Sequence, residues 1–289
     1  ECQLIVFVGA VGIAVRTIAP YIKNKLVDPA VLSVDEGGNF VIPLLSGHIG
    51  GANGFAKVLA KVIKATPVVT TATDVNKLFA VDEWAARNNM IINSMKAAKD
   101  FAAALVDGQE VGLFTDYPII SALPRQIVLK DKGVTGLAIT KNRNVNPFDL
   151  TVQLWPRNIY LGIGCRRGTT LESIETLVLP KLKELGIDLR TIVGVASVDL
   201  KKDEAGLLNF AAKYNWEISF FTAEELQNAA GEFSSSDFVK SVVGVSNVCE
   251  RSAVLAANNG SIISSKCSLN GVTLAVAEDD IVLDFEKLS

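Results

Sequence analysis

The sequence predicts an α/β fold with two alternating β/α three-layer domains and a small α+β insertion between them. In both halves of the chain, short apolar runs rich in β-branched residues alternate with segments of helical period. This alternation is typical of parallel sheets covered by crossover helices. The middle of the chain instead carries several short strands separated by Gly and Pro turns, which indicates the insertion. The length of 289 residues agrees with about two domains of ~150 residues each.

Residues 1–90 are expected to form the first domain. Apolar runs predict its strands at Leu4–Gly9, Ala30–Asp35, Phe40–Leu44 and Pro67–Val69. The segment from Ala52 to Lys64 has helical period and predicts an amphipathic surface helix with one apolar stripe. The stripe consists of Phe55, Val58, Leu59, Val62 and Ile63, with Lys57, Lys61 and Lys64 on the opposite face.

Residues 91–156 are expected to form the insertion, and residues 157–289 the second alternating domain. In the insertion, a helix is outlined by Ala97, Phe101 and Leu105, and strands are predicted at Val111–Phe114, Gln126–Leu129 and Leu137–Ile139. The boundary is placed at the break Leu154-Trp155-Pro156-Arg157-Asn158. Strands of the last domain are predicted at Ile159–Gly164, Thr191–Ala196, Glu217–Phe220, Ser261–Ile263, Val272–Ala277 and Ile281–Leu283. Its helices are predicted around Leu171–Leu185, kinked at Pro180, and at Glu204–Lys213 and Asn247–Asn258.

The composition excludes several classes of function. Lys and Arg number 28 against 31 Asp and Glu, a formal net charge of −3, so we expect no nucleic-acid partner, because phosphate binding needs concentrated positive charge. His48 is the only histidine, which rules out multi-histidine metal centres. The four cysteines (Cys2, Cys165, Cys249 and Cys267) form no C-x-x-C pair, and this pattern favours a reduced protein without a zinc site.

The start of the chain predicts a cytoplasmic protein with no membrane segment. The apolar run Cys2–Val15 ends at Arg16 and is shorter than the roughly 18 residues that span a bilayer. Glu1 precedes the run, whereas a signal peptide begins with a basic region. The chain opens without Met, directly in a predicted strand, so we expect the natural N-terminus to lie upstream of residue 1.

The first candidate loop is the glycine turn between the first strand and its helix, Gly9-Ala10-Val11-Gly12. Backbone N–H groups and the helix dipole at such a turn can face an anion, and Arg16 adds a guanidinium that could bind a carboxylate. A tight turn with a solvated arginine explains the pattern equally well. A nicotinamide dinucleotide is disfavoured, although Asp35 ends the next strand. The G-x-G-x-x-G fingerprint fails at Val11 and Ala14.

Two further candidate loops follow the strands around residues 44 and 69. The first, Leu45–Asn53, holds His48 among three glycines, so an imidazole base or acid lies beside N–H groups suited to an oxyanion. The second, Thr70–Asp74, places hydroxyls and a carboxylate at the carboxyl end of a strand, where open α/β sheets bind ligands. The structural alternatives are a histidine that hydrogen-bonds its own loop, and helix capping by Thr73 or Asp74.

The fourth candidate loop opens the last domain, at Gly162–Thr170. Arg166 and Arg167 are adjacent at a predicted helix N-terminus, which favours a local anion site over a solvated arginine pair. Glu172 follows Thr169 at the spacing of a capping box. Cys165 is interpreted as a packing residue, because no second histidine exists to activate it.

Together these motifs resemble the CbiG family, the cobalt-precorrin-5A hydrolases of anaerobic cobalamin biosynthesis. The resemblance covers almost the whole chain. It rests on Gly12–Arg16, Ile18-Ala19-Pro20, Asp28–Val31, Asp35-Glu36-Gly37, Leu44–Asn53, Thr70–Asp74 and Gly162–Thr169. It implies an additional strand and helix before residue 1. It also implies that the enzyme opens the δ-lactone of a cobalt-bound tetrapyrrole and expels acetaldehyde to leave cobalt-precorrin-5B.

That reaction leads to hypotheses about individual residues. His48 is the candidate base, with the Gly50 and Gly51 amides as the oxyanion site, and Asp74 is a second base or orients His48. Arg16, Arg166 and Arg167 are candidate clamps for the substrate's acetate and propionate groups. The substrate-binding set is completed by Ser46, Asn53, Thr71, Thr73 and Thr169.

The substrate should bring its cobalt already coordinated by its own nitrogens, so we expect no protein metal site and no cofactor. A homo-oligomer is compatible with the sequence. Two other functions stay open at this stage. The chain could bind or transfer a corrinoid intermediate without turnover, or, less favoured, act as a nicotinamide-dependent dehydrogenase.

Overall fold

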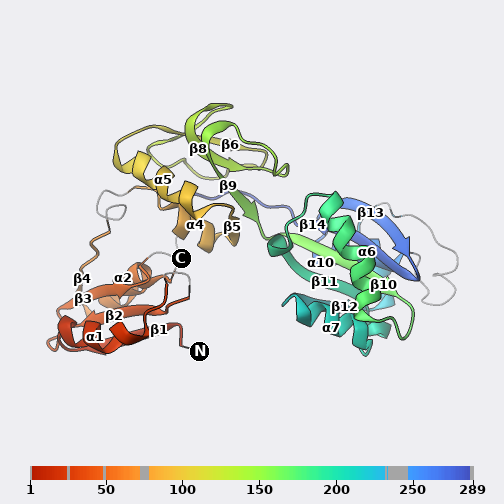
Figure 1. Cartoon of the computed structure of the whole chain (residues 1–289), viewed down its shortest axis with the longest axis horizontal. Helices are drawn as coiled ribbons and strands as arrows, with labels where there is room; N and C mark the ends of the chain where they lie inside the picture. The colour runs from red at the N-terminus through yellow and green to blue at the C-terminus, as the bar shows by residue number, and fades with distance from the viewer. Residues whose placement is uncertain are drawn as a thin grey trace. The chain divides into compact units, whose positions relative to one another are not determined.

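The computed structural model describes residues 2–24, 27–47, 50–71, 78–231, 233 and 247–286 (Figure 1). The chain forms two compact units, the first made of Glu1–Trp155 with Leu283–Ser289 and the second of Pro156–Val282. The predicted α/β class is confirmed, with helices covering mixed, largely parallel sheets.

The N-terminal sheet of the first unit has the strand order β1-β2-β3-β4. The strands are β1 (Leu4–Val8), β2 (Ala30–Val34), β3 (Phe40–Leu45) and β4 (Thr66–Pro67), and the helices are α1 (Val11–Ile18), the 3-10 turn η1 (Ala19–Tyr21) and α2 (Ala52–Ile63). β1 is parallel to β2 and β3 is parallel to β4, but β2 and β3 are antiparallel. A short turn joins β2 to β3, and so short a connection permits only antiparallel pairing.

Asp35 closes this turn. Its carboxylate accepts hydrogen bonds from the Phe40 backbone N–H at 2.6 Å and from Asn39 Nδ2 at 3.0 Å. The Phe40 N–H is the main reason that the pKa of Asp35 lies below its ordinary value. Asp35, whose position after the second strand is that of a ribose-binding acid in dinucleotide-binding folds, thus stabilises a turn.

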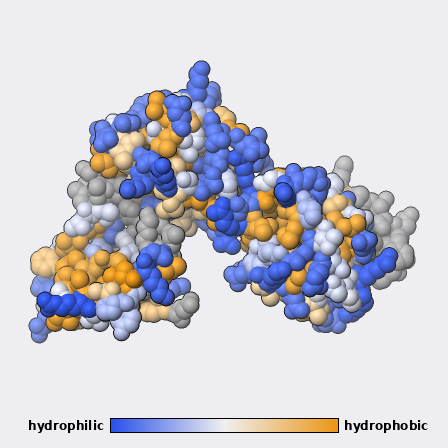
Figure 2. All heavy atoms as spheres, viewed as in Figure 1, coloured by the Kyte–Doolittle hydropathy of each residue, from blue (hydrophilic) through white to orange (hydrophobic). Residues whose placement is uncertain are grey.

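The predicted amphipathic helix is α2, but of its apolar stripe only Leu59 packs against the core, because the helix buries its small residues instead. Ala52, Asn53, Ala56 and Ala60 face the core, whereas Phe55, Val58 and Val62 are exposed. Alanines allow the helix to approach β2 and β3 closely, where they contact Leu32 and Val41. The large apolar side chains of α2 and of α1 contribute to the apolar surface seen over this sheet in Figure 2.

Helix α1 covers the opposite face of the same sheet. Ala30, Leu32 and Val34 of β2 point into the α2 side, and side chains alternate along a strand. Val31 therefore points the other way, into a cavity of about 200 Å³ that is also lined by Ile18 of α1 and Leu45 of β3. Helices thus lie on both faces of the sheet, while Val6 and Val8 of β1 stay exposed.

The central sheet of the first unit has the order β5-β9-β8-β6-β7. Its strands are β5 (Met90–Ile92), β6 (Val111–Thr115), β7 (Ile127–Leu129), β8 (Gly133–Ile139) and β9 (Phe148–Pro156), with helices α4 (Val81–Arg87) and α5 (Met95–Val106). Strand β9 covers residues 154–156, which the sequence had suggested as a break between domains. The Phe148 ring lies over Gly112 and Gly136, where a Cβ atom would overlap it.

The segment from Leu283 to Glu286 contacts the first unit. Leu283 forms a single β-bridge with Ile119, and Asp284 accepts a 2.9 Å hydrogen bond from the Trp84 indole. The Phe285 ring stacks on Trp84 with centroids 4.7 Å apart. The predicted strand Ile281–Leu283 is therefore wrong, since only Leu283 pairs.

The second unit contains one five-stranded sheet with the order β12-β11-β10-β14-β13. Its strands are β10 (Ile159–Cys165), β11 (Ile192–Val198), β12 (Glu217–Phe221), β13 (Ser261–Leu269) and β14 (Val272–Glu278). Its helices are α6 (Leu171–Glu184), α7 (Ala205–Lys213), α8 (Ala223–Gln227) and α10 (Val248–Ala256), with the 3-10 turns η2 (Leu189–Thr191) and η3 (Asp199–Lys201). β10, β11 and β12 are parallel, and β14 is antiparallel to β10.

Alternation along β14 shows the three layers of this unit. Leu274 and Val276 belong to the core that includes Ile174 of α6 and Phe210 of α7. The intervening Ala275 packs in a second cluster with residues of α10. Helix α10 lies so close to β10 that a Cβ on Gly162 would overlap the Cys249 carbonyl oxygen. Gly162 is thus a packing glycine inside a strand and not part of a turn.

Within the described ranges, none of the helices combines the length and apolar character that a bilayer crossing requires.

Candidate functional site

The loop between β3 and α2 is closed by its own backbone. The Ala52 N–H donates to the Ser46 carbonyl oxygen at 3.1 Å, and the Asn53 N–H donates to that of Gly47 at 2.9 Å. Ser46 has φ +56° and its hydroxyl donates to the Asp28 carbonyl oxygen at 2.9 Å. These bonds hold together the described ends of the loop that contains His48 (residues 45–53), the histidine loop.

Two glycines of this loop are required by its shape. A Cβ on Gly50 would overlap the Ser46 side chain and lie 2.9 Å from the Ser46 carbonyl oxygen. Gly51 precedes α2 with φ +78°, a backbone conformation that glycine adopts without steric cost. The shape of the loop therefore explains why both positions are glycine, independently of any role of their N–H groups toward a ligand.

Asn53 connects this loop to the segment after β4. It is buried, with 2% of its surface exposed, and its Nδ2 donates a 2.8 Å hydrogen bond to Thr71 Oγ1. β3 and β4 are parallel, so the segments that follow them meet at one edge of the sheet. The structure thus brings together five of the candidate residues, Ser46, Gly50, Gly51, Asn53 and Thr71. The other candidates from these loops, His48, Thr73 and Asp74, lie outside the described residues.

The first glycine turn belongs to the opposite edge of that sheet. β1 is parallel to β2, which is antiparallel to β3, so Gly9 and Ser46 follow strands that run in opposite directions. Arg16 is exposed and lies in the last turn of α1, not beside Gly9. The neighbouring Thr17 lines a cavity with Leu45 of β3. The end of α1 therefore lies near the edge of the sheet where the histidine loop begins. Gly9 thus precedes the start of α1 and Arg16 lies in its last turn, and an anion site formed by both stays a prediction.

In the second unit, the loop between β10 and α6 carries the two adjacent arginines. The helix is capped by Thr170, whose hydroxyl accepts from the Ser173 N–H at 3.3 Å. The predicted capping box of Thr169 and Glu172 is therefore wrong, because the N-cap is Thr170, one residue later. Thr169 instead donates its hydroxyl to the Arg166 carbonyl oxygen at 2.8 Å and braces the loop.

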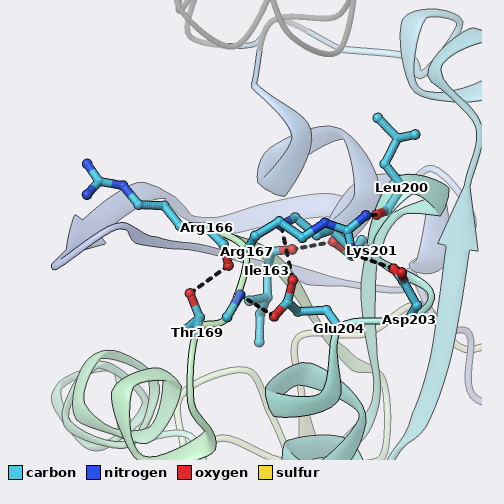
Figure 3. A network of polar contacts seen from close by, with 10 residues as sticks. Ile163, Arg166, Arg167, Thr169, Leu200, Lys201, Asp203 and Glu204 are labelled. Atoms are coloured by element: carbon cyan, nitrogen blue, oxygen red, sulfur yellow. Dashed lines mark hydrogen bonds and ion pairs between the residues drawn. The ribbon is translucent and has the colours of Figure 1, made fainter.

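The two guanidinium groups point in different directions (Figure 3). Arg167 binds Asp203 at 2.7 Å and the Leu200 carbonyl oxygen at 3.3 Å. This pair raises the pKa of Arg167 and lowers the pKa of Asp203, mainly through the hydrogen bond between them. The Arg166 side chain extends away, beside Gly271. The loop therefore offers two separate cations, and their role as carboxylate clamps stays a prediction.

Glu204 is a site residue that the sequence analysis missed. Its Oε1 accepts a 2.8 Å hydrogen bond from the Gly168 N–H, and its Oε2 lies 3.4 Å from the Lys201 ammonium. Only 4% of its surface is exposed. The glycine-turn amide expected to face a ligand thus already binds a carboxylate of the chain. The only sequence signal was a Lys–Glu pair three residues apart before a helix, and such a pair is usually solvated.

The loops of this second site share one edge of the sheet. Arg166–Thr169 follow β10 and Asp199–Glu204 follow β11, and the two strands are parallel neighbours. β10 is also where the sheet changes to the antiparallel β14. Ligands of open α/β sheets bind outside the carboxyl ends of the strands, and both loops lie at that edge.

Cys165 lies at the end of β10 and packs against the main core of this unit. Burial is the main cause that raises the pKa of its thiol, which disfavours the thiolate form that a nucleophile needs. In the part of the chain that the structure describes, no three His, Cys, Asp or Glu side chains are grouped as metal ligands.

Comparison with known proteins assigns the chain to a family. Family models match residues 1–74 (Cobalamin synthesis G N-terminal), 79–156 (Cobalamin biosynthesis central region) and 159–277 (Cobalamin synthesis G C-terminus). A relative from Salmonella typhimurium, named cobalt-precorrin-5A hydrolase, is 36% identical over 94% of this chain and 81% of that protein. A relative of the same name from Priestia megaterium is 31% identical over 94% of this chain and 78% of that protein.

A solved structure of a cobalamin biosynthesis protein G homolog from Sulfolobus solfataricus is 26% identical, covers 96% of this chain and 82% of that chain, and has a TM-score of 0.40. With three models in sequence order and relatives matched along most of its length, the chain belongs to the CbiG family.

Proposed function

We propose that this protein is a hydrolase that opens the δ-lactone of cobalt-precorrin-5A, releasing acetaldehyde and leaving cobalt-precorrin-5B, in anaerobic cobalamin biosynthesis. The observation that carries the proposal is the 36% identity over 94% of the chain to a relative named for this activity. In this reaction water attacks the ester carbonyl, and the released alkoxide fragments in a retro-aldol step.

Arg166 and Arg167 supply the cations that carboxylate recognition needs. The substrate carries acetate and propionate groups, and guanidinium groups bind carboxylates through charge-assisted hydrogen bonds. Both arginines are exposed at the carboxyl edge of the sheet, and the neighbouring Thr169 braces their loop. Arg167 would exchange Asp203 for a substrate carboxylate, because an exposed ion pair contributes little to stability.

The histidine loop is proposed to hold the reacting carbonyl. His48 is the only imidazole in the sequence, and imidazole acts as a base near neutral pH. Gly50 and Gly51 would offer N–H groups to the oxyanion, with Asp74 orienting His48 or serving as a second base. Asn53 and Thr71 support these groups through their hydrogen bond. Ser46, Thr73 and Arg16 complete the proposed substrate-binding set.

Three further expectations belong to this proposal. The cobalt enters as part of the substrate, so the protein needs no metal site or cofactor of its own. The protein acts in the cytoplasm, and a homo-oligomer is compatible with this function.

The decisive test is anaerobic incubation with cobalt-precorrin-5A and an assay for acetaldehyde. The unmodified chain should release acetaldehyde, and His48→Ala should bind the substrate but release almost none. Asp131→Ala, which removes an exposed acid from the central sheet region, is the control and should retain full release. No acetaldehyde from the unmodified chain would contradict the function. Normal release by His48→Ala would contradict only the assigned base.

A further inference from the structure

Glu204 uses its side chain to bind a neighbouring loop and not its own helix. It occupies the N-cap position of α7, but it makes no side-chain hydrogen bond to that helix. Its Oε1 instead accepts from the Gly168 N–H at 2.8 Å (Figure 3). Glutamate is not among the residues that favour the N-cap position, so local helix capping does not explain why it is there.

Lys201 supplies the counter-charge that makes this burial tolerable. Its ammonium lies 3.4 Å from Glu204 Oε2, and the two side chains are 15% and 5% exposed. Removing ions from water is costly, and a buried pair of this kind adds little net stability. A buried carboxylate at this position is therefore better explained by what it holds in place, which is the loop that carries Arg166 and Arg167.

The first turn of α7 touches the same loop a second time. A Cβ on Gly206 would overlap the Thr169 carbonyl oxygen, so the helix start lies directly against the loop backbone. Gly168 has φ +74°, and its peptide N–H is the one that Glu204 accepts from. Residues 204–206 thus restrain two consecutive residues of the loop, next to both arginines.

We infer that Glu204 is a positioning residue that sets the affinity of this loop for the carboxylate groups of a tetrapyrrole, without contacting them. The inference rests on the proposed function for the role of Arg166 and Arg167. Without the Glu204 carboxylate, the Gly168 N–H and the Lys201 ammonium lose their acceptor, and the loop samples other conformations. Substrate binding then weakens, while the chemical step at the lactone carbonyl is unchanged.

The test compares Glu204→Ala, Glu204→Gln and Glu184→Ala. Glu184 is the matched control, because it also pairs with a lysine three residues before it, Lys181, at 2.7 Å, but is 66% exposed on α6. Two sets of measurements are made for each variant, after its fold is checked by circular dichroism. One is kcat and KM for acetaldehyde release from cobalt-precorrin-5A. The other is the Kd for uroporphyrin, a tetrapyrrole that bears acetate and propionate groups.

Glu204→Ala should raise KM and the uroporphyrin Kd about tenfold, equivalent to 1.4 kcal/mol, with kcat nearly unchanged. Glu204→Gln should recover most of the affinity, because its amide oxygen still accepts from Gly168, and Glu184→Ala should match the unmodified chain. If Glu204→Ala does not fold, hydrogen exchange of the Gly168 amide is measured in Glu204→Gln and compared with the affinity of that variant. Gly168 should stay protected wherever affinity is kept.

Unchanged KM and Kd in a folded Glu204→Ala variant would overturn the inference, as would a fall in kcat alone or equal losses in Glu184→Ala. Weaker uroporphyrin binding by Glu204→Ala supports it even if the unmodified chain releases no acetaldehyde. In that case only the proposed function fails.

Discussion

The Asn53 amide donates a 2.8 Å hydrogen bond to the Thr71 hydroxyl, and this bond joins the histidine loop to the segment after β4. Asn53 is buried in the first turn of α2, whereas Thr71 lies outside any helix or strand. Two motifs that are separate in the sequence therefore form one hydrogen-bonded cluster.

Thr71→Val should weaken this cluster, because valine has the shape of threonine but no acceptor. A lost hydrogen bond to a buried group costs about 1–3 kcal/mol, so the thermal unfolding midpoint of the first unit should fall by a few degrees. Thr71→Ser keeps the acceptor and is the control. Equal midpoints for the Val and Ser variants, measured by calorimetry, would show that the bond does not stabilise the loop.

Arg166→Ala should reduce substrate affinity with little effect on stability, because the side chain is exposed. Loss of one charge-assisted carboxylate contact, about 1.5–3 kcal/mol, should raise KM roughly tenfold or more. The control is Arg190→Ala, which removes an equally charged side chain paired with Asp188 at 2.9 Å, before the start of β11. Steady-state kinetics of acetaldehyde release measure both. A similar KM for the two variants would contradict the assignment of Arg166.

Gly206→Ala should destabilise the second unit, because its Cβ would overlap the Thr169 carbonyl oxygen. Gly54→Ala is the contrast, since a Cβ there meets no atom within 4 Å. Replacing a helical glycine by alanine normally stabilises by about 1 kcal/mol. Thermal unfolding should therefore shift down for Gly206→Ala and slightly up for Gly54→Ala. An upward shift for both would mean that α7 does not lie against the loop.

Tyr214 should make the second unit sensitive to alkaline pH. Burial, followed by its 2.6 Å hydrogen bond to Glu175, raises the pKa of Tyr214 from 10.0 to about 12. The folded state therefore retains a proton that the unfolded state releases. Its contribution to stability is complete below pH 10 and is lost as the pH rises to about 12. The midpoint difference between the unmodified chain and Tyr214→Phe should shrink over this window, and a constant difference would contradict the assignment.

Thiol labelling should separate the four cysteines by burial. Cys2 is exposed, whereas Cys249 is buried and its pKa is raised to about 11, mainly by that burial. Because the thiolate is the reactive form, Cys2 should react first and Cys249 only after denaturant is added. Cys2→Ser should remove the fast phase in a DTNB assay. If Cys249→Ser removed part of the labelling seen without denaturant, Cys249 would be reactive in the folded protein. The α10 side of the sheet would then open readily.

Cys165→Ala should keep nearly full acetaldehyde release, because this thiol packs in the core and burial raises its pKa. A complete loss of activity in a variant that still unfolds cooperatively would contradict a role in packing alone and make Cys165 a candidate nucleophile.

Local patterns in the sequence were enough to place most elements. The strand predicted at Leu4–Gly9 is β1, and the helix predicted at Glu204–Lys213 is α7. Both depend on residue spacing within one segment. β9 was missed because Trp155 and Pro156 look like a boundary; the compact units do divide between these two residues, but the strand runs up to and includes Pro156.

The sequence alone determined the class of fold, the alternation of strands and helices, and the position of the glycine-rich loops, since periodicity and turn chemistry act over a few residues. Tertiary structure decided which face of α2 is buried, because the close approach of α2 to β2 and β3 favours alanine over larger side chains. It also decided that Gly168 binds Glu204. Partners 36 residues apart meet only once β10 and β11 pair, and no local pattern encodes that encounter.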